Sequence, residues 1–399
     1  MFYGSKFFKN GQIFCALALL IFMGLLAACS DVTVAPTLSQ SAAVSNGAAA
    51  SSSTPTTSAS TPVTPDATST PVPPTPQVTL PPETSPTVAV TTAQPVNTAA
   101  KPPQQPASGP GGQDYLYGKV TAHKYGQGDQ AYYIYEPAQP APAQPLPVIA
   151  FLHGYAGVNP DSDGYTAWIN HLVRRGNILI FPVYQDRNST DGTNYTENAL
   201  TALKAALPRL QDGTHVKPDL GNFSLLGYSA GGVIATNLAA RAEKSGLPVA
   251  KTLVAVSPGG CSNCSILAIR NFTLDQPAEL AAIPASTRLL LMVGNQDIIV
   301  GKSAASLIWQ NTAQIPAANK NYLEFDTDNY GTPGLVADHG LATRHNAFNF
   351  YGTWKLYDAL ESCSIEGKWC EVALGNTPLQ RNLGSWSDGT PVKEITVLG

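Results

Sequence analysis

A serine that could act as a nucleophile lies in the pattern Gly-x-Ser-x-Gly at residues 227–231, where Ser229 is the central residue. A β-like run at residues 222–225 precedes the pattern, and a helical pattern at residues 233–244 follows it. A sharp strand-to-helix turn strains the serine backbone, so it needs small neighbours, and it lifts the hydroxyl clear of the sheet. The first N–H groups of the following helix point at the same place. We therefore predict Ser229 as the nucleophile of an acyl-transfer reaction.

The other candidate residues also follow predicted strands. His153 comes after a continuous apolar run, Asp297 comes after a second apolar run, and His339 lies beyond the last predicted strand. Ligands of a parallel sheet bind outside the carboxyl ends of its strands. A serine hydroxyl becomes a good nucleophile when an imidazole accepts its proton and a carboxylate orients the imidazole. The chain order Ser, acid, His therefore fits a single reactive site.

Strand and helix patterns alternate from residue 115 onward, which predicts an α/β fold. We expect a mostly parallel twisted sheet with helices on both faces, in one domain over residues 113–399. The last strand is expected to add an edge to this sheet. Strands are predicted at residues 118–124, 130–136, 147–152, 177–183, 222–225, 252–256, 288–293, 322–325 and 394–398, and helices at residues 166–175, 195–210, 233–244 and 345–360.

Together these motifs resemble those of the α/β-hydrolase superfamily, over about residues 115–399. The resemblance implies an esterase or lipase type of activity in which Ser229 is the nucleophile, Asp297 the orienting carboxylate and His339 the general base. It also implies an oxyanion hole formed by the backbone N–H groups of Ala230 and Tyr155. The matching stretches are Phe-Leu-His-Gly-Tyr at 151–155, Gly-Tyr-Ser-Ala-Gly at 227–231, Val-Gly-Asn-Gln-Asp at 293–297 and Val-Ala-Asp-His-Gly at 336–340.

Both predicted partners of the serine have rivals. His345 lies six residues after His339, but it opens a predicted helix. Asp297 follows a strongly apolar strand, which favours it over the acids Asp326, Asp328 and Asp338. Asp338 could instead shape the histidine loop, and His153 is expected to hold the oxyanion loop rather than to react. The remaining histidines, His123, His171 and His215, are predicted to lie at the surface.

An aromatic, moderately apolar substrate cleft is predicted from Tyr155, Trp168, Tyr184 and Tyr228, although plain packing is an equal possibility for Trp168. Residues 261–284 are too few for a large lid, which favours an open cleft and short or medium acyl groups. In this respect the chain looks loosely like secreted cutinase-like and polyester-degrading hydrolases. A carboxylic ester is the expected substrate. A peptidase or amidase with the same residues, or a non-catalytic surface binding protein of the same fold, is the alternative.

The chain begins with a predicted export signal over residues 1–28. Lys6 and Lys9 precede an apolar run at residues 13–26 that is short for a membrane span. The run ends in Leu-Ala-Ala-Cys at 26–29, which resembles the lipobox of bacterial lipoproteins. This resemblance implies that Cys29 becomes the lipid-carrying N-terminus of an extracytoplasmic protein anchored to the cell membrane. An ordinary signal peptide and an uncleaved anchor are the alternatives.

Residues 29–112 are rich in Ser, Thr, Ala and Pro and have almost no aromatic residues. Such a composition cannot form a core, so we predict a disordered tether between the anchor and the domain. Removing the signal takes away Lys6 and Lys9 and no acids, so the net charge of −4 becomes −6. A mildly acidic chain without a basic cluster offers nothing to nucleic acid.

Four cysteines remain after the signal segment, and they allow three pairings. The oxidising compartment and the short separations favour Cys261–Cys264 and Cys363–Cys370, with a zinc site as the less favoured alternative. No complete phosphate-binding loop and no Gly-x-Gly-x-x-Gly motif occur in the sequence. We therefore expect no cofactor and no catalytic metal, and a chain that acts as a monomer.

Overall fold

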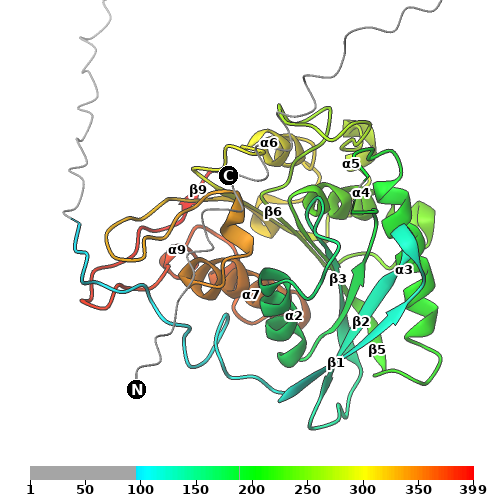
Figure 1. Cartoon of the computed structure of the whole chain (residues 1–399), viewed down its shortest axis with the longest axis horizontal. Helices are drawn as coiled ribbons and strands as arrows, with labels where there is room; N and C mark the ends of the chain where they lie inside the picture. Colours follow the sequence, from blue (N-terminus) through cyan, green and yellow to red (C-terminus); the bar gives the residue numbers. More distant parts are fainter. Residues whose placement is uncertain (1–95, 188) are drawn as a thin grey trace, which may run out of the picture. The chain divides into compact units, whose positions relative to one another are not determined.

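The computed structural model describes residues 96–187 and 189–399. The predicted signal, Cys29 and most of the predicted tether lie outside the described residues. Within them, one nine-stranded sheet has the order β1-β2-β4-β3-β5-β6-β7-β8-β9 (Figure 1). The strands are β1 (Lys119–Tyr125), β2 (Tyr132–Ala138), β3 (Leu146–Leu152), β4 (Ile178–Pro182), β5 (Pro218–Tyr228), β6 (Thr252–Val256), β7 (Arg288–Gly294), β8 (Lys320–Phe325) and β9 (Thr396–Val397).

The six central strands, from β4 to β8 in the sheet, run parallel. Their apolar runs are buried on both faces, as the side chains of β4 and β6 are at every position. This is the pattern expected of strands covered by helices on both sides. The β1–β2 hairpin and the C-terminal strand β9 pair antiparallel at the two edges. The predicted α/β fold with a mostly parallel sheet is confirmed.

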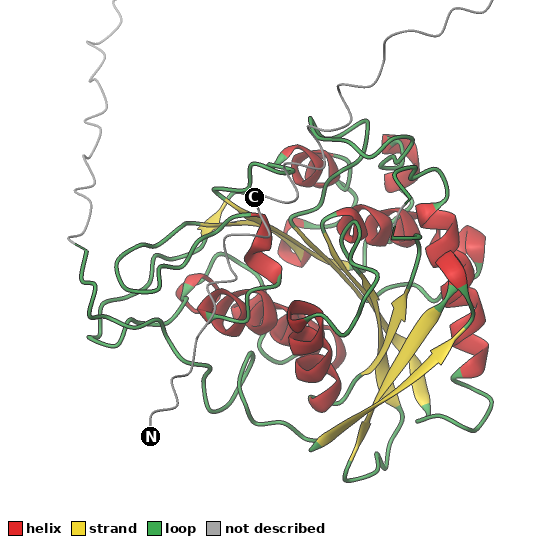
Figure 2. Ribbon diagram, in the orientation of Figure 1, coloured by secondary structure: helices red, strands yellow, loops and turns green. Residues whose placement is uncertain are grey.

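Helices cover both faces of the sheet (Figure 2). On one face, α3, α4 and α6 pack on an apolar cluster that contains Leu203, Leu238 and Ile308. On the other face, α2 and α7 pack on a second cluster that contains Trp168 and Trp354. The helices are α2 (Asp163–Arg174), α3 (Tyr195–Arg209), α4 (Ala230–Ser245), α5 (Pro277–Leu280), α6 (Ser303–Gln310), α7 (Trp354–Glu366), α8 (Cys370–Ala373) and α9 (Pro378–Arg381), with a π-helical turn (Asn349–Thr353) leading into α7 and short 3₁₀ turns at Gly128–Gln130, Ala317–Asn319 and His339–Ala342.

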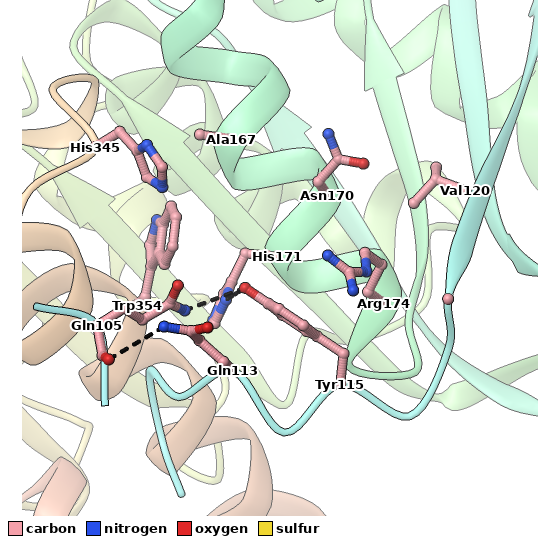
Figure 3. A pocket seen from close by; sticks show the side chains of 11 residues that line it. Gln105, Gln113, Tyr115, Val120, Ala167, Asn170, His171, Arg174, His345 and Trp354 are labelled. Carbon is pink, nitrogen blue, oxygen red and sulfur yellow. Dashed lines mark hydrogen bonds between the residues drawn. The ribbon is translucent and has the colours of Figure 1, made fainter. Parts of the chain in front are cut away.

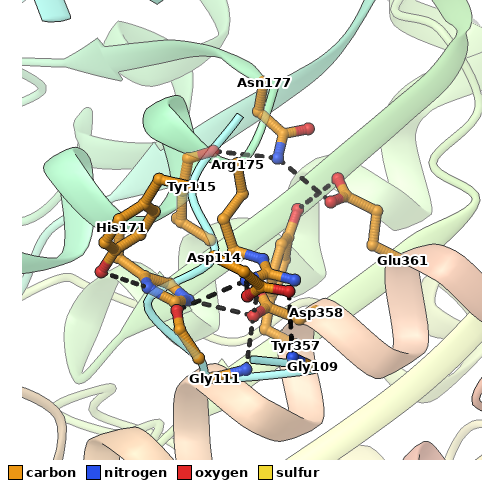
Figure 4. Close-up of polar contacts among 12 residues, drawn as sticks. Gly109, Gly111, Asp114, Tyr115, His171, Arg175, Asn177, Tyr357, Asp358 and Glu361 are labelled. Carbon is orange, nitrogen blue, oxygen red and sulfur yellow. Dashed lines mark hydrogen bonds and ion pairs between the residues drawn. The ribbon is translucent and has the colours of Figure 1, made fainter. Parts of the chain in front are cut away.

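The ordered domain begins earlier than residue 113, the boundary predicted from composition. Ala100 is buried, and the Asn97 N–H donates to the Tyr330 carbonyl at 2.8 Å. The Gly111 N–H donates to the Asp358 carboxylate on α7 at 2.7 Å (Figure 4). These anchors are largely backbone groups, which leave no pattern of apolar side chains in the sequence. Residues 96–112 therefore belong to the domain and not to the tether.

A polar cluster connects this N-terminal segment with α2 and α7 (Figure 4). The His171 Nε2 atom lies 3.0 Å from an Asp358 oxygen, and the Arg175 guanidinium lies 3.1 Å from the same oxygen. Arg175 also pairs with Asp114 at 2.9 Å. His171 is buried and stacks on the Trp354 ring, so its predicted surface position is wrong. Its carboxylate partner, Asp358, is far away in the sequence, so the sequence around His171 does not indicate that the side chain is buried.

Glu361, on the same face of the domain, should make the stability of the protein depend on pH. Its carboxylate accepts hydrogen bonds from the Asn177 amide at 3.1 Å and the Tyr357 hydroxyl at 3.3 Å. Burial raises its pKa from 4.5 to about 7, and the neighbouring Asp358 charge adds to the rise. The native protein therefore holds a proton that the unfolded chain releases near pH 4.5. The free energy of unfolding should fall by on the order of 3 kcal/mol between about pH 4.5 and pH 7.

Glu361→Gln removes this titration, so the variant should lose much of that fall and be more stable than the wild type above pH 7. Denaturant unfolding at a series of pH values measures the effect. Glu366→Gln, at the exposed end of the same helix, is the matched control and should keep the wild-type slope. Equal slopes for Glu361→Gln and the wild type would contradict the assignment.

Two disulfide bonds join Cys261 to Cys264 and Cys363 to Cys370, the pairing that the sequence favoured. The first closes a turn in the loop after β6, and the second ties the end of α7 to the start of α8. Both constrain segments outside the sheet. None of the helices in the described part of the chain is long and apolar enough to cross a membrane.

Candidate active site

Ser229 occupies a strained turn between β5 and α4. Its φ of 56° and ψ of −123° lie in a region that side chains rarely adopt. A Cβ atom at Gly227 would overlap the Gly231 carbonyl, and one at Gly231 would overlap the Leu152 carbonyl. Both glycines are therefore needed for the turn to form against β3. The predicted strand, sharp turn and helix are present.

His339 lies between Ser229 and Asp297, although the three residues come from different parts of the chain. Its Nε2 atom is 3.0 Å from the Ser229 Oγ atom, and its Nδ1 atom is 2.8 Å from an Asp297 oxygen. A carboxylate oxygen only accepts, so Nδ1 carries the proton and Nε2 is left to accept from the serine hydroxyl. The structure thus brings the three predicted residues into one hydrogen-bonded chain.

The Asp297 side chain is fully buried and remains ionised. Burial is the largest single influence and raises the pKa of this carboxyl, but the interactions with His339 and with two backbone N–H groups together bring the pKa below its usual value. The backbone N–H groups of Ile299 and Val300 act in the same direction, since both donate to the other oxygen at 3.1 Å. Asp297 therefore offers one oxygen to the backbone and the other to the imidazole.

The loop that carries His339 is held from two sides. The Tyr228 hydroxyl donates to the His339 carbonyl at 2.7 Å, and its ring lies beside the imidazole. Asp338 accepts from the Gly340 N–H at 2.8 Å and forms a forked ion pair with Arg344. Asp338 thus holds the loop around His339 in shape, which was the alternative predicted for it instead of orienting the His339 imidazole. Tyr228 is partly exposed beside the site, where the cleft was predicted.

A second loop, residues 153–157 after β3, comes close to the serine. A Cβ atom at Gly154 would lie 3.3 Å from the Ser229 Cβ atom, so this backbone passes directly beside Ser229. Among the described residues, the backbone N–H groups of Tyr155 and Ala230 have no hydrogen-bond acceptor. They belong to the two segments that were predicted to provide an oxyanion hole.

Three side chains hold this loop in place, and two of them, Tyr165 and Gln185, were not predicted from the sequence. The Tyr165 hydroxyl accepts from the Gly154 N–H at 2.9 Å, and the Gln185 side chain accepts from the Ala156 N–H at 3.1 Å. The Tyr184 hydroxyl donates to the His153 carbonyl, and its ring stacks on the His153 imidazole. Tyr165 comes from α2, and Tyr184 and Gln185 come from the loop after β4, so no local sequence pattern indicates that they contact this loop.

His153 is buried, as expected of a structural residue. Its Nδ1 atom lies 2.7 Å from the Gly154 carbonyl, which can only accept, so Nδ1 carries the proton. Burial lowers the pKa of His153 to about 4. A neutral imidazole that donates back to its own loop stabilises that loop and is not available to exchange protons near neutral pH.

Two of the predicted cleft residues do not line a cleft. Trp168 is 1% exposed, and its indole N–H donates to the Ala342 carbonyl at 2.6 Å in the core between α2 and α7. Tyr184 is fully buried against His153, at the start of the loop at residues 153–157. Both predictions are wrong, because the Trp168 ring packs against Trp354 of α7 and the Tyr184 ring stacks on the buried His153.

The rivals of Asp297 and His339 lie outside the hydrogen-bonded chain. Asp326 accepts from the Asn295 amide at 2.8 Å, and Asp328 accepts from the Trp386 indole at 3.2 Å. His345 packs against the rings of Phe350 and Trp354. It precedes the π-helical turn rather than opening a regular helix, so the predicted start of that helix is also wrong.

Exposed apolar side chains occur on loops that leave the edge of the sheet at which Ser229 lies. The loops leave the carboxyl ends of β3 and β6, which flank β5 in the sheet, and of β7, which lies next to β6. The loop after β6 is hydrogen-bonded to the elbow, the sharp turn at Ser229 between β5 and α4, because the Gly259 N–H donates to the Ser229 carbonyl at 3.2 Å. These loops leave the same edge of the sheet as the turn at Ser229, and we refer to their exposed apolar side chains as the apolar rim. Its exposed members are Tyr155, Ile266, Leu267, Ile298 and Ile299.

A separate cavity of about 510 Å³ lies between the N-terminal segment, α2 and α7 (Figure 3). Tyr115, Asn170, Arg174 and His345 are among the residues that line it, and none of Ser229, Asp297 and His339 does. The cavity is therefore distinct from the reactive residues.

The strand order, the sharp turn at Ser229 and the position of Ser229 at the carboxyl end of β5 form the arrangement of the α/β-hydrolase fold. Residues 129–278 match the family model described as Chlorophyllase, which represents an α/β-hydrolase-like serine esterase family. The match covers β2 to the start of α5, including the oxyanion loop and the elbow, and it indicates an esterase-type hydrolase. No curated protein matches the sequence.

Proposed function

We propose that this protein is an extracytoplasmic serine hydrolase that cleaves carboxylic esters through an acyl-enzyme intermediate. Ser229 is the nucleophile, His339 the general base and acid, and Asp297 the residue that orients the imidazole. The observation that carries the proposal is the hydrogen-bonded chain in which His339 lies 3.0 Å from the Ser229 Oγ and 2.8 Å from the Asp297 carboxylate.

In the first half of the reaction, the Ser229 Oγ atom attacks the ester carbonyl carbon while His339 Nε2 takes the hydroxyl proton. The carbonyl oxygen becomes an oxyanion, which the N–H groups of Tyr155 and Ala230 stabilise. Each such donor typically lowers the barrier by about 3 kcal/mol in a site that excludes water. The intermediate then collapses, the bond to the alkoxy oxygen breaks, and His339 gives its proton to the departing alcohol.

In the second half, a water molecule attacks the acyl-enzyme and gives a proton to His339 Nε2. The second tetrahedral intermediate uses the same two N–H donors. Its collapse releases the carboxylic acid and returns the proton to Ser229. Asp297 stays ionised throughout, because its hydrogen bonds hold its pKa low, and it stabilises the imidazolium that forms in each half.

The substrate should carry an apolar acyl group. The side chains of the apolar rim are exposed on loops at the same edge of the sheet as Ser229, and contact with an apolar chain would remove that surface from water. They are Tyr155, Ile266, Leu267, Ile298 and Ile299. The reacting carbonyl would then meet the N–H donors of the loop after β3. An open rim of this kind accepts short and medium acyl groups and also the surface of an ester polymer.

The lipobox at residues 26–29 supports a location outside the cytoplasm, with Cys29 lipidated and residues 30–95 reaching from the membrane to the domain. Two short-range disulfides in the domain agree with an oxidising compartment. Mass spectrometry of the N-terminal peptide tests the anchor, and an unmodified Cys29 in the mature protein would contradict it.

The test of the activity uses the full-length protein with p-nitrophenyl esters from acetate to palmitate and with p-nitroanilides of the same acyl groups. We expect turnover of the esters, much slower turnover of the anilides, and labelling of Ser229 alone by a fluorophosphonate. Faster turnover of the anilides would favour an amidase. Absence of both turnover and labelling would leave only a binding role.

A further inference from the structure

We propose that His123, Glu136 and His215 form a binding site for a divalent metal ion of the zinc type, far from Ser229. One ligand atom from each residue lies within 4.8 Å of the other two. His123 lies on β1, Glu136 on β2, and His215 in the loop between α3 and β5. An ion at their centre would link the edge hairpin of the sheet to that loop.

The register of the hairpin places two of the ligands on one face. Thr121 faces Glu136, and His123 faces Ile134, in the antiparallel pairing of β1 with β2. Alternate residues of a strand share a face, so His123 and Glu136 are diagonal neighbours. The same face carries Ile134, which belongs to the apolar cluster under α3 and α4. His215 reaches this face from the end of the α3 segment.

Glu136 is the strongest indication of a cation. Its side chain is only 5% exposed, and among the described residues no lysine or arginine pairs with it. One of its oxygens accepts from the Val216 N–H at 2.6 Å. The other oxygen faces His215 Nδ1 at 2.8 Å and His123 Nε2 at 3.7 Å. A buried carboxylate that meets two imidazoles gains most when a cation lies between them.

The orientation of His215 agrees with metal binding. Its Nε2 atom lies 2.9 Å from the Tyr125 hydroxyl, so the ring is held with Nδ1 toward Glu136. A metal-binding histidine commonly donates its second N–H to a neighbouring oxygen, and Tyr125 is placed to accept it. The His215 side chain is buried, whereas His123 is nearly half exposed and is free to adjust.

The chemistry of the ligands favours zinc over calcium or magnesium. Two imidazole nitrogens and one carboxylate oxygen form a common zinc set, while calcium and magnesium prefer oxygen alone. Bonds of 2.0–2.1 Å in a tetrahedral site separate the ligand atoms by about 3.3 Å. The observed separations of 2.8 Å and 3.7 Å lie on either side of this value. Solvent would supply the fourth ligand on the exposed His123 side.

The expected role is structural. His215 precedes β5, and Ser229 follows it, so eleven residues of strand separate the two sites. Because β5 bulges where it pairs with β3, its length corresponds to the six steps from Leu146 to Leu152, or about 20 Å at 3.3 Å per residue. The edge strand β1 pairs with β2 alone, so an ion that holds both strands to the loop before β5 should stabilise this edge.

The test is calorimetric titration of Zn²⁺ into the full-length protein, produced without a histidine tag and first treated with a chelator. We expect one Zn²⁺ per chain, a Kd in the micromolar range or below, and an increase in Tm of several degrees at saturation. His123→Ala should weaken binding at least tenfold, and Tyr125→Phe, which keeps the ring, by about 10- to 100-fold. His345→Asn, which removes another exposed histidine, is the matched control and should bind normally.

Two outcomes would overturn the proposal. One is a protein that binds no Zn²⁺ saturably up to millimolar concentration. The other is binding that His123→Ala and Tyr125→Phe leave unchanged, which would place the ion elsewhere. His123 is half exposed and Tyr125→Phe removes one oxygen atom, so both variants should fold, and circular dichroism checks this. Neither readout depends on hydrolytic activity.

Discussion

Replacing Ser229 with alanine should lower kcat for p-nitrophenyl butyrate by about 10⁶-fold, since serine hydrolases lose this much when the nucleophile is removed. The oxyanion donors and the apolar rim remain in the variant, so a residual rate of about 10³- to 10⁴-fold over water is expected. Ser245→Ala, at the other end of α4, is the matched control and should keep wild-type kinetics. A Ser229→Ala protein that retains a hundredth of the activity would contradict the nucleophile assignment.

A second substitution at the same position separates chemistry from strain. Ser229 holds a φ of 56° that only glycine adopts without cost, and such strain is worth on the order of 1–3 kcal/mol. Ser229→Gly should therefore be as inactive as Ser229→Ala and yet unfold at a higher denaturant concentration. These two variants together would show that the strained turn at Ser229, which exposes the hydroxyl, lowers the stability of the protein.

The sheet could be predicted because its strands are marked locally. Residues 147–152 and 288–293 are continuous apolar runs that end in polar residues, and the structure places β3 and β7 there. The elbow was equally visible, because a serine between two glycines after a β run is a local signal. Ser229, Asp297 and His339 each follow a strand, so topology alone predicts that they gather at one edge of the sheet.

Other features could not be predicted, because they depend on contacts between distant segments. The burial of His171 depends on Asp358, which is 187 residues away. Trp168 was assigned to the cleft, since an aromatic residue near the site can line it or fill the core, and only the packing of α2 on α7 decides. Likewise, His123 and His215 looked like isolated surface residues until the fold placed Glu136 between them.

The N-terminal boundary was missed for a different reason. Amino-acid composition indicates whether a segment can form a hydrophobic core of its own, and residues 96–112 cannot form one. They are ordered nonetheless, because their backbone groups bond to Tyr330 and Asp358 on a domain that already has a core. Such a segment is ordered by its contacts with the rest of the domain and not by a core of its own.

Asp297→Asn should lower kcat by about 10⁴-fold while the fold is unchanged. One Asp297 oxygen accepts from the N–H groups of Ile299 and Val300, so the asparagine oxygen should take that place. The amide nitrogen would then face His339 Nδ1 and donate to it. The imidazole would be forced into the tautomer with its proton on Nε2, which cannot accept the proton of Ser229.

The rival carboxylates provide the controls for this prediction. Asp326→Asn and Asp338→Asn should each lower kcat by about tenfold or less, because these residues support loops and do not contact the imidazole. Steady-state kinetics on the same ester, with unfolding curves to exclude misfolding, compares the three variants. A loss for Asp338→Asn as large as that for Asp297→Asn would show that the shape of the histidine loop, and not the tautomer of His339, limits the reaction. Asp338→Asn loses the ion pair with Arg344, but its side-chain oxygen can still accept from the Gly340 N–H. The smaller loss of kcat is therefore the expected result.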